Sequence, residues 1–148
     1  MRILIADDHG IVRQGLRALL EEEDGIEIVG EAENGSEVVE LAAKLRPDVI
    51  IIDVSMPGVN GIEATRLIIE KMPSAKIVAL STYSKRSFVA EMLKAGALGY
   101  VLKSYLFDEL TRAIHAVIAN KHYLSPQITD VLIEDYIEIL LIIIMNLK

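Results

Sequence analysis

Short apolar runs alternate with amphipathic stretches along roughly the first 120 residues of the chain. Apolar runs at 2–6, 49–52 and 76–80 are each followed at once by polar residues, which is typical of strands buried in a parallel sheet. Shorter runs at 26–30 and 99–102 have a similar character. Apolar residues recur at helical spacing in five segments between and after these runs, at 12–20, 38–45, 62–71, 86–95 and 106–117.

This alternation predicts an α/β fold, because strand–helix pairs in series form a parallel sheet covered by helices on both faces. Right-handed crossovers leave few topologies for a doubly wound five-stranded parallel sheet. The favoured strand order is 2-1-3-4-5, the flavodoxin-like (βα)5 arrangement. Ser125 and Pro126 are typical of the start of a sixth helix. We therefore expect one domain at 1–122 and a C-terminal helical tail or linker, interpreted as truncated, at 123–148.

Composition narrows the class of protein. The 148 residues carry a net charge of −7 and contain no cysteine, which excludes disulfides and thiolate–metal sites. The acidic balance argues against a broad nucleic-acid interface. The apolar start at 3–6 meets Asp7 and Asp8 too early for a signal peptide, and the apolar run at 139–145 is shorter than the roughly 20 residues of a membrane span. We expect a cytoplasmic protein that does not enter a membrane.

Polar residues directly after the predicted strands are the candidates for chemistry. In an open parallel sheet, ligands bind beyond the carboxyl ends of the strands, where the strand order reverses. The first, third, fourth and fifth strands are neighbours in the favoured order, so their ends should meet at one edge. The residues at these ends are Asp7, Asp8 and His9 after the first strand, Asp53 after the third, Ser81 and Thr82 after the fourth, and Lys103 after the fifth.

Three carboxylates and one lysine at one edge favour a magnesium-dependent phosphoryl site. Crowded carboxylates raise one another's pKa unless a cation relieves the repulsion. Oxygen ligands suit a hard ion such as Mg²⁺, which usually keeps waters and binds phosphate oxygens. A lysine ammonium is a suitable point charge for a phosphoryl oxygen. Together these groups meet the needs of in-line phosphoryl transfer to an aspartate.

Each candidate also has an ordinary structural interpretation. An aspartate after a strand often caps the next helix, a lysine there is usually on the surface, and a Ser–Thr pair is common in turns. The three histidines are scattered, and we interpret each as a surface or core residue rather than a ligand. The placement of several such residues at one edge favours the functional interpretation.

The motifs at these positions resemble those of a known family. Ile-Ala-Asp-Asp-His at 5–9, Ile-Asp-Val-Ser-Met-Pro-Gly at 52–58, Leu-Ser-Thr at 80–82 and Gly-Tyr-Val-Leu-Lys at 99–103 occur in this order. Over residues 1–122 the chain resembles a CheY-like receiver domain of a two-component response regulator. The details resemble the NarL/FixJ/LuxR type, whose members usually carry a C-terminal DNA-binding helix-turn-helix.

The resemblance implies a role for each matched residue in phosphorylation. Asp53 would accept a phosphoryl group from the phosphohistidine of a sensor histidine kinase. Asp8 and Asp53 would bind Mg²⁺ directly together with the backbone carbonyl of Ser55, while Asp7 would act through a water molecule.

The same resemblance assigns the response to phosphorylation. Ser81 and Lys103 would contact the phosphoryl oxygens and complete the catalytic set. Ser81 and Tyr100 would form the switch, with the tyrosine turning inward. The domain would then be a regulator of transcription in its full-length form, and not an enzyme apart from Mg²⁺-dependent self-phosphorylation and autodephosphorylation.

The C-terminal segment limits these expectations. The 23 residues after Ser125 carry a net charge of 1 − 4 = −3 and are too few for a helix-turn-helix, so DNA binding would need an output domain that they do not contain. A homodimer through the tail or the last helices is expected.

Two other functions remain open at this point. A haloacid-dehalogenase-like phosphohydrolase also uses an aspartate nucleophile and Mg²⁺, but such enzymes have an Asp-x-Asp pair where this chain has adjacent Asp7 and Asp8. A flavodoxin-like cofactor binder would share the fold, but it needs a phosphate-cradling loop of Gly, Ser or Thr after the first strand, and this sequence has Asp-Asp-His there.

Overall fold

A parallel six-stranded sheet forms the centre of the computed structural model, which describes residues 1–82 and 86–147. The strands lie in the order β2-β1-β3-β4-β5-β6, and every neighbouring pair is parallel. Their bounds are β1 (Arg2–Ala6), β2 (Glu27–Ala32), β3 (Val49–Asp53), β4 (Ile77–Ser81), β5 (Gly99–Leu102) and β6 (Tyr123–Leu124).

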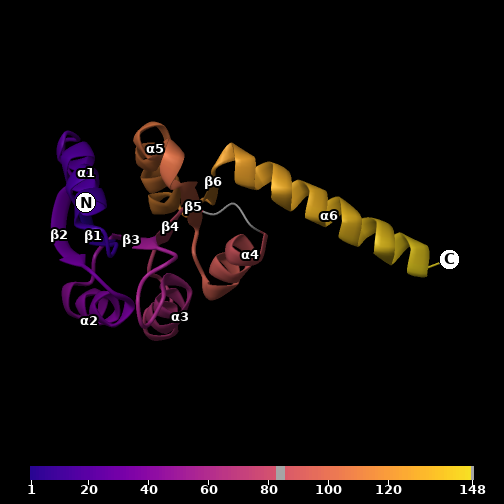
Figure 1. The fold of residues 1–148 in the computed structure, drawn as a ribbon, viewed down its shortest axis with the longest axis horizontal. Coiled ribbons are helices and arrows are strands. Elements are labelled where there is room, and N and C mark those ends of the chain that lie inside the picture. Colours follow the sequence, from indigo (N-terminus) through magenta and orange to yellow (C-terminus); the bar gives the residue numbers. More distant parts are fainter. Residues whose placement is uncertain (83–85, 148) are drawn as a thin grey trace.

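The doubly wound arrangement predicted from the sequence is confirmed. Helices α2, α3 and α4 cover one face of the sheet, and α1 and α5 cover the other (Figure 1). The short 3-10 helix η1 connects β5 to α5, and α6 follows β6. The helices span α1 (Gly10–Glu21), α2 (Gly35–Leu45), α3 (Gly61–Lys71), α4 (Arg86–Ala95), η1 (Lys103–Tyr105), α5 (Leu106–Ile118) and α6 (Pro126–Asn146).

The sixth strand is the one departure from the five-stranded sheet expected from the sequence. β6 contains two residues and pairs with β5, where the Tyr123 N–H donates to the Leu98 carbonyl at 3.1 Å and the Ser125 N–H donates to the Tyr100 carbonyl at 3.0 Å. A two-residue strand has no room for a periodic pattern, so the sequence alone did not predict it. The first residues of the predicted tail therefore belong to the sheet.

Alternation along the central strands builds two cores. Every residue of β3 and β4 is buried. On β3, Ile50 and Ile52 contact the core under α2, α3 and α4, whereas Val49 and Ile51 contact the core under α1 and α5. Burial on both faces explains why these strands are apolar throughout, and it holds the carboxyl end of β3 in a fixed position.

Helix α6 packs on the domain through its first turns. Ile128 is fully buried and Leu132 packs against the core, while the remainder of the helix extends away from the domain (Figure 1). Within the described ranges, we find no helix with the length and apolar character needed to cross a bilayer.

The turn from β3 to α3 depends on a glycine. The Gly61 N–H donates to the Val54 carbonyl at 2.9 Å, and the Asn60 side chain accepts from the Glu63 N–H at 3.0 Å to cap the helix. A Cβ atom on Gly61 would lie 2.1 Å from the carbonyl oxygen of Asp53. Only glycine therefore lets α3 approach the end of β3 this closely.

We predict that Gly61→Ala lowers the free energy of unfolding by about 1–3 kcal/mol, because backbone at Asp53 must move to admit the new methyl group. Thermal unfolding followed by circular dichroism measures the effect. Gly15→Ala in α1 is the matched control, since a Cβ there meets nothing within 4 Å. The control should be neutral or stabilising by roughly 0.5–1 kcal/mol. Equal melting temperatures for the two variants would contradict the assigned role of Gly61.

Candidate functional site

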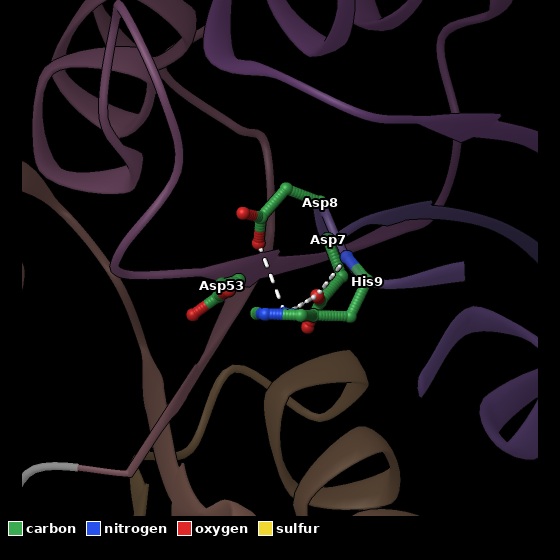
Figure 2. Close-up of side chains that lie close together, drawn as sticks. All are labelled: Asp7, Asp8, His9 and Asp53. Carbon is green, nitrogen blue, oxygen red and sulfur yellow. Dashed lines mark hydrogen bonds and ion pairs between the residues drawn. The ribbon is translucent and has the colours of Figure 1, made fainter. Parts of the chain in front are cut away.

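Four side chains meet at the carboxyl edge of the sheet. Asp7, Asp8 and His9 follow β1, and Asp53 ends β3 (Figure 2). One ligand atom from each of them lies within 4.8 Å of the others. The two strands are neighbours in the sheet, which is why Asp53 shares this edge with residues about 45 positions earlier in the sequence.

Asp7 is the most enclosed member of this acidic cluster. Its side chain is fully buried, and Oδ1 accepts a 2.8 Å hydrogen bond from the His9 N–H. Its Oδ2 lies 2.8 Å from Nζ of Lys103, the residue that follows β5. A buried carboxylate needs such a partner, because an unpaired charge in the interior is strongly unfavourable.

Asp53 shares the same lysine. Only 4% of its side chain is exposed, and Oδ2 lies 3.2 Å from Lys103 Nζ. Oδ1 accepts a 3.1 Å hydrogen bond from the Ser55 N–H in the loop after β3. Lys103 therefore bridges Asp7 and Asp53, and each carboxylate keeps additional oxygen lone pairs for another partner.

The charges of the cluster shift the pKa of Asp53 and Lys103. Burial raises the pKa of the Asp53 carboxyl to about 6 and the charge of Asp7 adds to the increase, while Lys103 and the Ser55 N–H oppose it. Burial lowers the pKa of the Lys103 ammonium, but its hydrogen bonds and charge interactions with Asp7 and Asp53 outweigh this and raise the pKa above the ordinary value. The site therefore retains a cationic lysine beside a carboxylate that is costly to ionise.

His9 lies at the outer side of the cluster, which agrees with the surface position expected from the sequence. Its side chain is 60% exposed, and Nδ1 lies 3.0 Å from Asp7 and 3.1 Å from Asp8. Its position directly after Asp7 and Asp8 in the sequence is the signal that places it beside the two carboxylates. It contacts both carboxylates, so it contributes to the polar surroundings of the cluster.

The donor set fits a magnesium ion. Asp8 lies at the opening with 30% of its side chain exposed, and Asp7 and Asp53 line the floor. Three carboxylates face one lysine, so the cluster has excess negative charge that a hard divalent cation would neutralise. Ser55 is adjacent to Asp53 through its N–H, and the proposed contribution of its carbonyl to the metal remains a prediction.

Ser81 and Tyr100 lie together beside this cluster. Ser81 ends β4 and Tyr100 lies on β5, and both are buried. Burial raises the pKa of the Tyr100 hydroxyl, a side-chain hydrogen bond with Ser81 opposes the shift, and the charge of Asp53 adds to it. The predicted pair of switch residues is thus in direct contact, with the aromatic ring inside the fold. Thr82 is exposed.

Comparisons with known proteins agree with this geometry. The family model described as response regulator receiver domain matches residues 3–115. The chain is 41% identical over 130 residues to the response regulator GacA of Pseudomonas viridiflava, covering 88% of this chain and 61% of that protein. It is 41% identical over 136 residues to the transcriptional regulatory protein DegU of Brevibacillus brevis, covering 92% of this chain and 58% of that protein.

A solved structure shows the same fold. The LuxR-family two-component response regulator from Aurantimonas sp. SI85-9A1 superposes with a TM-score of 0.88 at 38% identity, covering 92% of this chain and 97% of that one. The chain spans about three fifths of the length of the curated relatives it matches. The match does not support the phosphohydrolase alternative. Family model, relatives and fold together show that the chain belongs to the response regulator receiver domain family of two-component signalling.

Proposed function

We propose that Asp53 is the phosphoacceptor of this receiver domain and that a sensor histidine kinase is its phosphoryl donor. The observation that carries the proposal is the position of the Asp53 carboxylate, held between Lys103 and the Ser55 N–H at the floor of the acidic cluster. Receiver domains are signalling modules and not classical enzymes. The chemistry at Asp53, including self-phosphorylation and autodephosphorylation, is part of the proposal, as is a cytoplasmic location.

In the proposed step, an oxygen of the Asp53 carboxylate attacks the phosphorus of the donor's phosphohistidine. A P–O bond forms, the P–N bond breaks, and the imidazole nitrogen keeps the electron pair. Because the pKa of Asp53 is about 6, most of the population is ionised and nucleophilic at neutral pH. Mg²⁺, bound by Asp8, Asp53 and the Ser55 carbonyl and through water by Asp7, would supply positive charge to the transferred group.

The new phosphoryl group would change the interactions of Lys103 and Ser81. It adds a charge of about −1.5 to −2 and three strong acceptor oxygens. Lys103 already lies 3.2 Å from Asp53, so its ammonium can pair with one of these oxygens, and the Ser81 hydroxyl can donate to another. Moving a two-state element from mostly one state to mostly the other takes about 5.5 kcal/mol, which a few charge-assisted hydrogen bonds can supply.

Tyr100 connects this change to the rest of the protein. Its hydrogen bond with Ser81 ties the ring to the residue that would contact the phosphoryl group. Its backbone carbonyl accepts from the Ser125 N–H at the start of α6. We infer that the phosphorylated state is transmitted through β5 to the start of α6. We also infer that the domain, together with an output domain, regulates transcription, as the name of the DegU relative states for that protein. DNA binding would belong to an output domain outside these residues. Self-association through the C-terminal segment or the last helices, as a homodimer in the simplest case, also remains a prediction.

We predict that the chain gains one phosphoryl group when incubated with Mg²⁺ and acetyl phosphate, as measured by intact mass spectrometry. Asp53→Asn should abolish the adduct, because the amide is not a nucleophile for phosphorus. Asp24→Asn, at an exposed position far from the cluster, should retain it. An adduct that survives in Asp53→Asn would refute the assignment.

Mg²⁺ should raise the melting temperature of the unphosphorylated protein, because an ion that binds only the folded state stabilises it by about 2.7 kcal/mol at 100 times its dissociation constant. Asp8→Asn should remove most of this increase, since Asp8 is the carboxylate at the opening of the cluster. Asp24→Asn again serves as control. If Asp8→Asn responds to Mg²⁺ as the wild type does, the metal site is wrongly assigned.

Stability without metal should depend on pH through Asp53. The pKa of Asp53 is about 6 in the folded state and roughly 3.9 when unfolded, so between these values the folded protein binds more protons and loses stability as pH rises. In EDTA, the free energy of unfolding of Asp53→Asn should therefore exceed that of the wild type by about 1–3 kcal/mol at pH 7.5. This difference should disappear near pH 4. Urea unfolding at several pH values tests this, and a difference that does not change with pH would contradict it.

A further inference from the structure

The hydroxyl group of Ser125 is buried at the edge of the sheet. Ser125 follows β6 and precedes α6, beside β5 (Figure 1). None of its surface is exposed. Its Oγ accepts a 3.0 Å hydrogen bond from the Leu102 N–H, and its own N–H donates to the Tyr100 carbonyl at 3.0 Å. Ser125 is therefore bonded to β5 through both its backbone and its side chain.

The hydroxyl takes the place of a backbone carbonyl in the ladder between β5 and β6. In a parallel pair, a residue usually donates its N–H to one carbonyl of the neighbouring strand and accepts a later N–H of that strand through its own carbonyl. The Ser125 carbonyl is engaged elsewhere, because it accepts from the Ile128 N–H at 2.8 Å and the Thr129 N–H at 3.1 Å to begin α6. The side-chain oxygen therefore completes the ladder where the backbone turns from strand to helix.

This contact differs from an ordinary helix cap. Ser125 stands at the N-cap position of α6, where a serine hydroxyl commonly accepts from an N–H in the first turn of its own helix. Among the described residues of α6, no N–H donates to this hydroxyl. Its hydrogen bond to β5 is therefore not explained by the stability of α6.

The N–H that Ser125 binds lies directly before the site lysine. Leu102 is the last residue of β5 and is 7% exposed, and the backbone leaves the sheet at Lys103, the first residue of η1. The Lys103 ammonium lies 2.8 Å from Asp7 and 3.2 Å from Asp53. The hydrogen bond to Ser125 therefore fixes the backbone from which Lys103 reaches both carboxylates.

Other contacts fix the segment that carries Ser125. The Tyr123 N–H donates to the Leu98 carbonyl at 3.1 Å, and the Tyr123 hydroxyl donates to the Glu109 carboxylate at 3.0 Å. Glu109 is buried on α5, and Ile128 in the first turn of α6 is buried in the core. The Ser125 hydroxyl is thus held on both sides of its position in the chain.

We propose that Ser125 is a positioning residue for Lys103: its hydroxyl fixes the end of β5 and so keeps the ammonium between Asp7 and Asp53. A buried N–H without a partner is unfavourable. Without the hydroxyl, the end of β5 moves until the Leu102 N–H finds another acceptor, and Lys103 moves with it. This role does not require phosphorylation, whereas its effect on phosphoryl transfer rests on the function proposed above for Asp53.

Amine labelling of the full chain in EDTA tests the position of Lys103 without phosphorylation. With N-hydroxysuccinimidyl acetate, Lys103 should react slowly in the wild type, because its side chain is 15% exposed and paired with two carboxylates. In Ser125→Ala it should react about tenfold faster relative to the exposed Lys121, as measured by peptide mass spectrometry. Ser125→Cys, whose sulfur is a weaker acceptor, should give an intermediate ratio.

The matched control for labelling is Ile128→Ala, which weakens the packing of α6 but keeps the Ser125 hydroxyl. Its labelling ratio should equal that of the wild type. A ratio that is unchanged in both Ser125 variants, or raised equally in Ile128→Ala, would overturn the proposal.

Phosphorylation in Mg²⁺ and acetyl phosphate, followed by intact mass against time, tests whether Ser125 acts through Lys103. Ser125→Ala should slow the reaction roughly tenfold when Lys103 is present and have no further effect in the Lys103→Ala background, because residues that share one interaction are not additive. An equal slowing in both backgrounds indicates a general structural role and overturns the proposal. If the wild type gains no phosphoryl group, the function proposed for Asp53 fails, and the labelling ratio still decides the role of Ser125.

Discussion

One ion-pair arrangement underlies the rest of this site: the Lys103 ammonium lies between two buried carboxylates, at 2.8 Å from Asp7 and 3.2 Å from Asp53. Buried carboxylates are tolerated only when a cation and hydrogen bonds compensate them. One lysine cannot compensate three carboxylates, because Asp8 adds a further charge at the opening. The cluster is therefore held together and yet retains excess negative charge, which is the condition for binding a divalent cation.

The sheet determines where these charges lie. Asp7, Asp53 and Lys103 follow or end three parallel strands whose apolar residues are buried on both faces, so their backbones have little freedom to move apart. The same rigidity joins the site to the C-terminal segment. β5 carries Tyr100 and leads into Lys103. It also pairs with β6, and the Ser125 N–H directly after β6 donates to the Tyr100 carbonyl. The acidic cluster and the start of α6 are therefore connected through a single strand, β5.

Much of the fold and site could be predicted from sequence pattern. The apolar run before Asp53 indicated a buried strand that ends at a functional edge. The rule of right-handed crossovers then left few topologies, among which the flavodoxin-like order of the five strands was favoured. The method failed where the pattern was too short, because β6 has only two residues.

The amino-acid sequence by itself determined which residues are buried, which strands are neighbours and which polar residues share the carboxyl edge, because periodicity and chain connectivity encode these features. Tertiary structure alone decided that Lys103 bridges Asp7 and Asp53, that burial raises the pKa of Asp53 to about 6, and that Tyr100 points inward against Ser81. These depend on distances of a few ångströms between side chains from different strands, and Coulomb and desolvation energies change steeply over such distances.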